Sequence, residues 1–476
     1  MATKRRKPTK KKSAKKAKKK ASKKKPARKK VKKKPAKKKS ARKSAKKKAA
    51  KKKAAKKKAA RKPAKKKAGK KKSAAKKATA TTSSSGIATV AGIIRTHAKN
   101  LSGKVSLVQG DRVQTWQELY KRSSQVAQAL KAAGVGSQDR VAFLDKNSIE
   151  HFEVFYGCAL LNAVSVDINF RLAAPEVAFI VNDAQAKVFV VGPDFVPVLD
   201  AIVGDLKFTK KIVVIGGHPT HESYESWVSR YQPIDPGTDS KPHDVAFQLY
   251  SSGTTGRPKG VMLTNDNFLG ILPSARDLWG MNEHAVNLVA MPLFHIGGSG
   301  WATAGQYNGC KSIILRDTTD IGGMVKMITQ HRITHAFMVP ALLAFTLMVP
   351  DIDKADFSSL KLIAYGASPI SEQVLAASLK TFKCSFVQVY GLTETTGVVT
   401  MLMHEDHDVD GPKKHLLRSC GKPSMGVELK IVDEQGKEVP AGEVGEIIIR
   451  SRQVMKGYWN MPQETAKSIR NGWFYT

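Results

Sequence analysis

The amino-acid sequence predicts an α/β protein with helix-covered, mostly parallel sheets, a small antiparallel β subdomain and a disordered basic tail. Three observations carry this prediction. Short apolar runs rich in β-branched residues alternate with helical patterns, two strand-like runs near the end are joined by turn residues, and the first 80 residues carry only basic charge. The first pattern is typical of parallel sheets and the second of an antiparallel pair.

Buried strands are predicted at a series of apolar runs. Their continuous apolar character is typical of strands that are covered on both faces. The runs are residues 141–144, 187–192, 211–217, 312–316, 361–366 and 385–390.

Helices are predicted between these runs. Thr115 and Glu118 have the spacing of a capping box, and apolar residues recur on one helical face over 116–130. Further helices are expected over 148–163 and 371–382. This alternation predicts parallel sheets with helices on their faces.

The last part of the chain has a different pattern. Residues 427–451 contain two strand-like runs joined by turn residues, which predicts an antiparallel unit within a β-rich subdomain over about 411–476. Since residues 86–476 exceed one ordinary core, this domain is expected to divide into two or more subdomains.

Charge is strongly segregated along the chain. There are 83 Lys and Arg against 38 Asp and Glu, and residues 1–80 hold 45 of the basic residues and no acidic one, which leaves 38 of each sign in the remainder. The first segment is an array of Lys, Ala, Ser and Pro with too little apolar surface to offset its ordering entropy. We therefore expect residues 1–85 to be a disordered tail and linker.

A loop rich in glycine and hydroxyl groups stands at residues 250–261, "YSSGTTGRPKGV". It is not a Walker phosphate loop, because Lys259 is followed by Gly260 rather than by a Ser or Thr that could reach Mg²⁺. A strand-like run precedes it, so its backbone N–H groups, hydroxyls and Lys259 could still fold around a polyphosphate. Taken alone, such a loop is more often a plain surface turn.

Further strings of the same kind follow in order: "PLFHIGG" (292–298), "YGAS" (365–368), "YGLTET" (390–395), "GEIIIRS" (445–451) and "GYWN" (457–460). With the loop, they resemble the motifs of the AMP-forming adenylating enzymes, the superfamily of acyl-CoA synthetases, peptide-synthetase adenylation domains and firefly luciferase. The resemblance extends from about Ile87 to Thr476. It implies the large N-terminal domain of these enzymes, with two helix-covered sheets.

The resemblance implies a two-step reaction. A carboxylate attacks the α-phosphate of ATP to give acyl-AMP and pyrophosphate, and the acyl group then passes to a thiol, for which we expect CoA. The protein is therefore predicted to be an AMP-forming acid–thiol ligase. Attack on phosphorus crowds negative charge, which Mg²⁺, a lysine and hydrogen-bond donors must offset.

Catalytic roles are implied for three residues. His295 would lie where the carboxylate and the α-phosphate meet, Thr393 would bond the α-phosphate, and Glu394 would hold Mg²⁺. Alone, His295 could be a satisfied core histidine and Glu394 a surface acid, but their places within "PLFHIGG" and "YGLTET" favour the functional roles.

Nucleotide-binding roles are implied for two further groups. The backbone of Gly366 and Ala367 would complete an adenine slot beside Tyr390 and Gly391, with Tyr390 against the adenine. The residues implied to close over the β- and γ-phosphates are Ser251, Ser252, Gly253, Thr254, Thr255, Gly256 and Lys259.

The acid is expected to be a medium- or long-chain fatty acid, with aryl acids left open. Amino-acid-activating relatives place an Asp just after the position of Phe294, where this chain has His295 and then no acid through Ser299. A buried ammonium without a counter-charge is costly, which disfavours amino acids. The apolar stretch 336–350 could wall a tunnel for an alkyl chain or could be ordinary core.

The chain ends at "NGWFYT", where the family pattern continues into Gly-Asp, a hinge and a small C-terminal lid domain. This lid carries the adenylation lysine in the family. Its absence from the sequence leads us to expect that residues 1–476 alone bind nucleotide weakly and catalyse poorly.

The tail indicates a second kind of partner. Its Lys-Ala-Pro array resembles histone H1 tails and would bind nucleic acid without reading bases, or alternatively an anionic membrane surface. A non-specific nucleic-acid-binding protein with a vestigial adenylation domain is therefore the alternative function. No transmembrane segment is predicted, and we expect a cytoplasmic protein, with the tail suited to a nucleoid or membrane surface.

Overall fold

The computed structural model describes residues 86–251 and 257–476, which belong to one compact unit. The predicted basic tail (1–85) and the phosphate-loop residues 252–256 lie outside the described residues.

The first sheet of the described residues is built mainly from the predicted parallel strands. Strands β3 to β8 in this sheet pair in parallel, and the β8–β9 and β9–β19 pairs are antiparallel. Its order is β19 (Gly457–Tyr458), β9 (Lys259–Thr264), β8 (Val245–Ser251), β4 (Val164–Asp167), β3 (Arg140–Leu144), β5 (Val188–Val191), β6 (Lys211–Val214) and β7 (Glu222–Ser223).

The second sheet has a parallel centre and antiparallel edges. Its β1–β2, β14–β15 and β15–β16 pairs are antiparallel and the others are parallel. Its order is β16 (Lys422–Pro423), β15 (Gly397–Leu402), β14 (Ser385–Leu392), β13 (Leu362–Gly366), β12 (His335–Met338), β10 (Val286–Val289), β11 (Lys311–Ile314), β1 (Val105–Gln109) and β2 (Arg112–Thr115).

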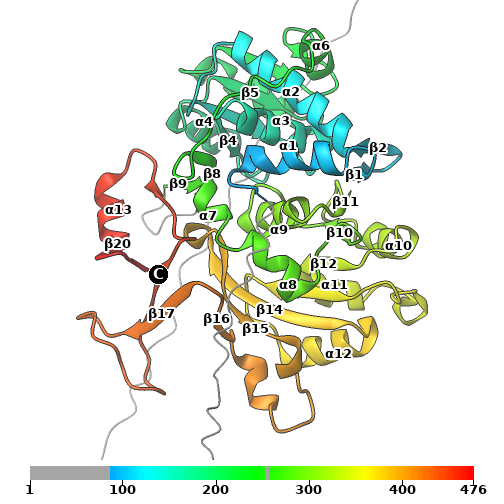
Figure 1. Ribbon diagram of the computed structural model, residues 1–476, viewed down its shortest axis with the longest axis vertical. Helices are drawn as coiled ribbons and strands as arrows, with labels where there is room; N and C mark the ends of the chain where they lie inside the picture. Colours follow the sequence, from blue (N-terminus) through cyan, green and yellow to red (C-terminus); the bar gives the residue numbers. More distant parts are fainter. Residues whose placement is uncertain (1–85, 252–256) are drawn as a thin grey trace, which may run out of the picture. The chain divides into compact units, whose positions relative to one another are not determined.

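A small antiparallel sheet lies near the C-terminus, marked C in Figure 1. Its strands are β17 (Val427–Val432), β18 (Glu446–Ser451), β21 (Trp473–Tyr475) and β20 (Ile469–Arg470). The β17–β18 pair is the predicted antiparallel unit, so the predicted fold class is confirmed.

Helices cover the sheets and fill the space between them (Figure 1). Helices α4 and α5 pack on one face of the first sheet, and α10 to α12 pack on one face of the second. The helices of the described residues are α1 (Val90–Asn100), α2 (Trp116–Ala132), α3 (Ile149–Leu160), α4 (Ala174–Asp183), α5 (Val196–Ile202), α6 (Tyr224–Ser229), α7 (Asn265–Phe268), α8 (Ala275–Trp279), α9 (Ile296–Tyr307), α10 (Ile321–Gln330), α11 (Pro340–Leu347), α12 (Glu372–Phe382) and α13 (Pro462–Ser468).

The local signals for these helices are confirmed. Helix α2 begins with the predicted capping box: Thr115 Oγ1 accepts from the Glu118 N–H at 3.2 Å, and the Glu118 carboxylate accepts from the Thr115 N–H at 2.7 Å. Helices α3 and α12 occupy the ranges predicted over 148–163 and 371–382. The apolar stretch 336–350 divides into β12 and α11 at Pro340.

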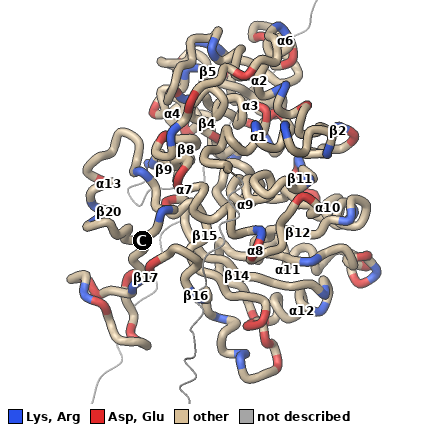
Figure 2. The backbone as a smooth tube through the Cα atoms, viewed as in Figure 1, with Lys and Arg blue, Asp and Glu red and all other residues tan. Residues whose placement is uncertain are grey.

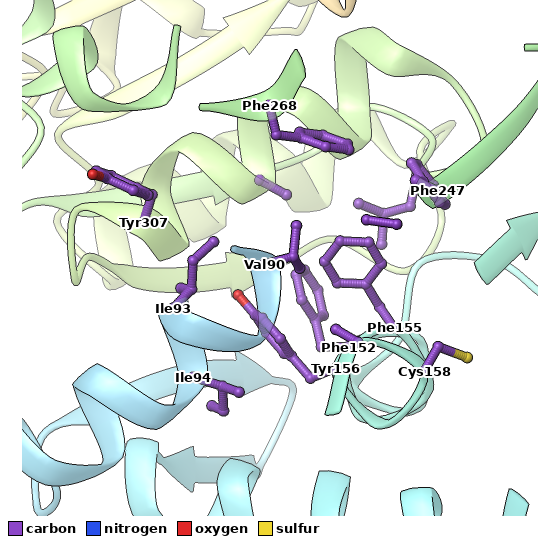
Figure 3. Packing of buried hydrophobic residues seen from close by; sticks show 14 of the residues in the cluster. Val90, Ile93, Ile94, Phe152, Phe155, Tyr156, Cys158, Phe247, Phe268 and Tyr307 are labelled. Carbon is purple, nitrogen blue, oxygen red and sulfur yellow. The ribbon is translucent and has the colours of Figure 1, made fainter. Parts of the chain in front are cut away.

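The largest core joins the two sheets. Side chains of α1, α3, β8, α7 and α9 meet there, as the close view in Figure 3 shows for Ile93, Phe155, Phe247, Phe268 and Tyr307. Elements far apart in sequence are thus fixed against one another by apolar burial. The site described below lies beside this core.

Charges of both signs are distributed over the elements of the described residues (Figure 2). This agrees with the equal numbers of basic and acidic residues outside the tail. None of the helices in 86–251 and 257–476 has the length and apolarity needed to cross a membrane.

Acid destabilises the fold through a buried histidine. His335 in β12 is 1 % exposed, its Nε2–H donates to the Trp279 carbonyl at 2.7 Å, and burial lowers its pKa. The unfolded chain therefore binds a proton near pH 6.5 that the folded chain does not, so stability falls as the pH falls below that value. We expect His335→Gln to lose less unfolding free energy between pH 7 and pH 5 than the wild type, measured by denaturant titration.

The matched control is His404→Gln, because the His404 side chain is 59 % exposed. Its pH dependence should equal that of the wild type. If the unfolding free energies of His335→Gln and of the wild type fall equally between pH 7 and pH 5, His335 is not the source of the acid sensitivity.

Candidate active site

The predicted phosphate loop is the connection of a hairpin. Ser251 ends β8, Lys259 begins β9, and the two residues are direct partners across the antiparallel pair. The loop thus begins and ends at one place on the first sheet. Five of its candidate residues, Ser252 to Gly256, lie outside the described residues.

Ser251, at the start of the loop, contacts Glu394. Glu394 lies in a short 3₁₀ turn (Thr393–Thr395) that follows β14, with Thr393 beside it. The Ser251 hydroxyl donates to Glu394 Oε1 at 3.1 Å, and the Tyr458 hydroxyl donates to the same oxygen at 3.1 Å. Among the described residues, no hydrogen-bond partner occupies Oε2.

Lys259 is nearly buried next to this carboxylate. Its side chain is 10 % exposed, its Nζ donates to Glu464 Oε2 at 3.3 Å, and Nζ lies 4.9 Å from the centre of the Tyr458 ring. A buried ammonium needs such partners, because desolvating an unpaired charge is costly.

The predicted adenine slot is a place where strands approach too closely for side chains. A Cβ on Gly366 would lie 2.0 Å from the Val389 carbonyl oxygen, and one on Gly391 would lie 1.6 Å from that of Gly397. Ala367, directly after β13, has a φ of 66°, a conformation that non-glycine residues adopt mainly where the surroundings impose it. Gly366 is buried beside Val389 and lines none of the cavities described below, whereas Ala367 is exposed and lines them, two of them together with Tyr390 and Gly391.

His295 caps the N-terminus of α9. Its Nδ1 accepts from the Gly297 N–H at 3.2 Å, which places the proton of the neutral ring on Nε2. Burial, assisted by the positive charge of Arg171, lowers the pKa of His295. The neutral ring therefore presents one N–H donor.

Three cavities converge at Ala367, which lines all of them. Cavity A has a volume of about 80 Å³, cavity B about 610 Å³ and cavity C about 740 Å³. His295 lies between A and B, and Tyr390 and Gly391 lie between A and C. Groups bound in the three cavities would therefore meet at one point.

The linings differ in chemistry. The residues that line cavity A away from Ala367 are apolar and include Phe268, Ile271, Leu272, Trp279, Trp301 and Ala304. Cavity B has Phe294, Ile321, Val339, Leu342 and Phe345, with Arg171 as its one cation among the lining residues. Cavity C has polar side chains, among them Ser368, Ser371, Gln388, Arg418 and Ser419. No acidic residue lines A or B in the described chain.

The described residues contain no cluster of three or more His, Cys, Asp or Glu that could hold a metal ion alone. Glu394 nevertheless fits Mg²⁺, because this ion is commonly bound through one or two carboxylates together with substrate phosphates. The carboxylate has one oxygen fixed by two hydroxyl donors and one without a partner among the described residues.

The structure brings the described candidates together in two groups. Ser251, Lys259 and Glu394 gather around Tyr458, while His295, Ala367, Tyr390 and Gly391 line the converging cavities.

Sequence reasoning missed several contributors, namely Tyr458, Glu464, Phe337 and Trp301. Tyr458 was visible as part of "GYWN", but the string alone gave it no partner. The aromatic wall of cavity A comes from separate elements, with ring centres 5.5 Å apart for Trp279 and Trp301 and 6.0 Å apart for Trp301 and Phe337. The stretch 336–350, left open between tunnel wall and core, lines cavity B through α11 and both A and B through Phe337.

Residues 94–459 match the family model of the AMP-binding enzymes. The chain is 36 % identical over 391 residues to a fatty acid–(acyl-carrier-protein) ligase of Streptomyces coeruleorubidus, covering 80 % of this chain and 72 % of that one. It is 31 % identical to a feruloyl-CoA synthase of an Amycolatopsis species, covering 77 % and 71 % of the two chains. It is also 31 % identical to a long-chain-fatty-acid–CoA ligase of Mycobacterium tuberculosis, covering 76 % of this chain and 70 % of that one.

Solved structures agree with this relationship. The N-terminal domain of FACL13 from Mycobacterium tuberculosis matches with a TM-score of 0.75 at 28 % identity, covering 82 % of this chain and 95 % of that one. An anthranilate CoA ligase in complex with anthranoyl-AMP matches with a TM-score of 0.76 at 27 % identity, covering 82 % and 74 %. The chain therefore belongs to the AMP-binding enzyme family, as an AMP-forming acid–CoA ligase that activates an acyl or aryl carboxylic acid through its adenylate.

Proposed function

We propose that the protein activates a medium- or long-chain fatty acid with ATP and transfers the acyl group to CoA, with residues 86–476 as the adenylation domain and 411–476 as its β-rich subdomain. The observation that carries this proposal is the convergence of three chemically different cavities at Ala367. A reaction of a nucleotide, an apolar acid and a thiol needs three such approaches to one reacting centre.

The linings support one assignment of the cavities. Cavity C, lined by polar side chains and by Ala367, suits AMP. Cavity A, which is apolar and lined by Trp301 and Trp279, has a volume of about 80 Å³ and suits the part of the acyl chain next to the carboxyl group, and cavity B, which also includes His295 in its lining, suits the thiol arm. The carboxyl carbon and the α-phosphate would then lie beside His295.

The residues fit the chemistry of both steps. A carboxylate oxygen bonds to the α-phosphorus as the bond to the bridging oxygen breaks, and pyrophosphate leaves with that oxygen. In the second step a thiolate sulfur bonds to the acyl carbon and AMP leaves. The His295 Nε2–H, Thr393 and Lys259 supply donors to the crowded oxygens, and Mg²⁺ bound at Glu394 would offset phosphate charge.

The lining of cavity A supports an acid without an amino group. Because no acidic residue lines cavity A, a substrate ammonium group would be buried there without a counter-charge, which is costly. Relatives include ligases named for fatty acids and for aryl acids. The Trp301 position lies about 9 Å along α9 from His295 at 1.5 Å per residue, so this ring limits the length of a bound chain.

Removal of the His295 side chain should weaken binding of a stable acyl-adenylate analogue. We expect His295→Ala to reduce the affinity for the analogue up to about tenfold, the upper end of the usual effect of losing a hydrogen bond to an uncharged oxygen, while AMP, which lacks the acyl carbonyl oxygen, binds as to the wild type. Calorimetry of both ligands measures this. Replacement of the exposed His404 by Ala is the control, and an equal loss for AMP and analogue would contradict the role of His295.

Shortening Trp301 should lengthen the preferred acyl chain. In a ladder of acyl-adenylate analogues, Trp301→Leu should favour longer chains than the wild type, since each further methylene that gains room adds about 0.8 kcal/mol, or about fourfold in affinity. Trp227→Leu is the matched control, because Trp227 is 2 % exposed and lies on α6, outside the lining of all three cavities. If Trp301→Leu shows the same chain-length preference as the wild type, the acyl chain does not bind against Trp301.

The tail supports a second activity, non-specific binding of nucleic acid. The observation in its favour is the 45 Lys and Arg of residues 1–80, without an acidic residue. The whole chain should bind two unrelated DNA duplexes equally, with an affinity that falls at least about 10³-fold between 50 and 200 mM salt. Binding to anionic vesicles but not to DNA would contradict this activity and assign the tail to a membrane surface.

A further inference from the structure

Two charged groups of the proposed active site are held by one segment late in the chain. Glu394 and Lys259 both contact residues of 457–468, which comprise β19 and α13. The motif string "GYWN" (457–460) lies within this segment.

Tyr458 stands between the two charges. Its hydroxyl donates to Glu394 Oε1 at 3.1 Å, and its ring faces the Lys259 ammonium at 4.9 Å. Tyr458 is 6 % exposed, so its hydroxyl has little contact with water.

The position of Tyr458 is fixed by the backbone on both sides. Its Cα pairs with that of Val261 in the β19–β9 ladder, two residues after Lys259, and its N–H donates to Thr465 Oγ1 at 2.9 Å. The Met455 N–H donates to the Glu394 carbonyl at 2.8 Å. These contacts hold the backbone of Tyr458 and that of Glu394 at a fixed separation, and the phenol bridges it.

The two oxygens of Glu394 are thereby made unequal. Oε1 accepts from Tyr458 and Ser251, while Oε2 has no hydrogen-bond partner among the described residues. A carboxylate held through one oxygen presents the other in a fixed direction, and outer partners of this kind orient metal ligands.

We propose that Tyr458 is a positioning residue that orients Glu394 so that its second oxygen binds the Mg²⁺ of Mg·ATP. This assignment rests on the proposed function. Tyr458 acts through Glu394, whereas Lys259 is held separately by Glu464 at 3.3 Å, and Glu464 also accepts from Lys467 at 2.7 Å.

The test is the Mg²⁺ dependence of ATP binding by the whole chain, measured by calorimetry over a range of Mg²⁺ concentrations. Tyr458→Phe keeps the ring against Lys259 and removes only the hydroxyl. We expect the Mg²⁺ concentration for half-maximal ATP binding to rise about tenfold, the lower end of the usual effect of losing such a partner. The ATP affinity at saturating Mg²⁺ should stay within about twofold, because the phosphate contacts remain.

Two further variants separate positioning from general damage. Tyr120→Phe removes a comparable tyrosine–carboxylate bond, from Tyr120 to Asp235 at 3.0 Å, and should leave the Mg²⁺ dependence unchanged. In a Glu394→Gln background, Tyr458→Phe should have no additional effect on that dependence, because the residue acts through the carboxylate.

The outcomes distinguish the two levels of the proposal. If the wild type binds ATP and Tyr458→Phe shows the same Mg²⁺ dependence, the role of Tyr458 is overturned and the proposed function is not. An equal effect of Tyr458→Phe in the presence and absence of Glu394 would also overturn that role. Wild-type protein that binds no ATP at any Mg²⁺ concentration would overturn the proposed function and this assignment with it.

Discussion

The close approach of backbones at the ends of β13, β14 and β15 is the constraint on which the site depends. Gly366 and Gly391 leave no room for a Cβ against the carbonyls of Val389 and Gly397, and Ala367 takes a left-handed conformation between them. The main chain therefore turns away from the sheet at one point. The three cavities share Ala367, the residue that follows Gly366 at the end of β13.

Electrostatics in the site follow from burial. The nearly buried Lys259 is neutralised by Glu464, Glu394 is held by two hydroxyl donors, and the pKa of His295 is lowered by desolvation and by the charge of Arg171. Lys259 and one oxygen of Glu394 thus have partners within the described chain, while Glu394 Oε2 and the His295 Nε2–H have none among the described residues and are directed by the contacts of the neighbouring atoms. The apolar core between the sheets makes this possible, because it fixes β8, α7 and α9 relative to one another (Figure 3).

Much of the fold could be predicted because its signals are local. The capping box of α2 and the apolar runs of the parallel strands act within a few residues. The stretch 336–350 was ambiguous because apolar periodicity cannot separate a short strand from a short buried helix, and it contains one of each, β12 and α11.

Of the residues that form the site, only those within the motif strings could be predicted from the sequence. Ser251, His295, Glu394 and Tyr390 stand in strings with a recognisable order, and the structure brings them to the cavities or to one another. Tyr458 and Glu464 could not be predicted, because their partners lie 64 and 205 residues away in the chain. The left-handed Ala367 was also invisible, since alanine carries no local preference for that conformation.

The central claim is that one acyl adenylate spans cavities A and C across Ala367. Calorimetry of the whole chain with AMP and with a stable analogue of a fatty acyl adenylate tests it most directly. Because burial of the acyl chain adds about 0.8 kcal/mol per methylene, the analogue should bind at least about 10²-fold more tightly than AMP. Equal affinities for the two ligands would show that the acyl chain finds no cavity next to the nucleotide and would contradict the account.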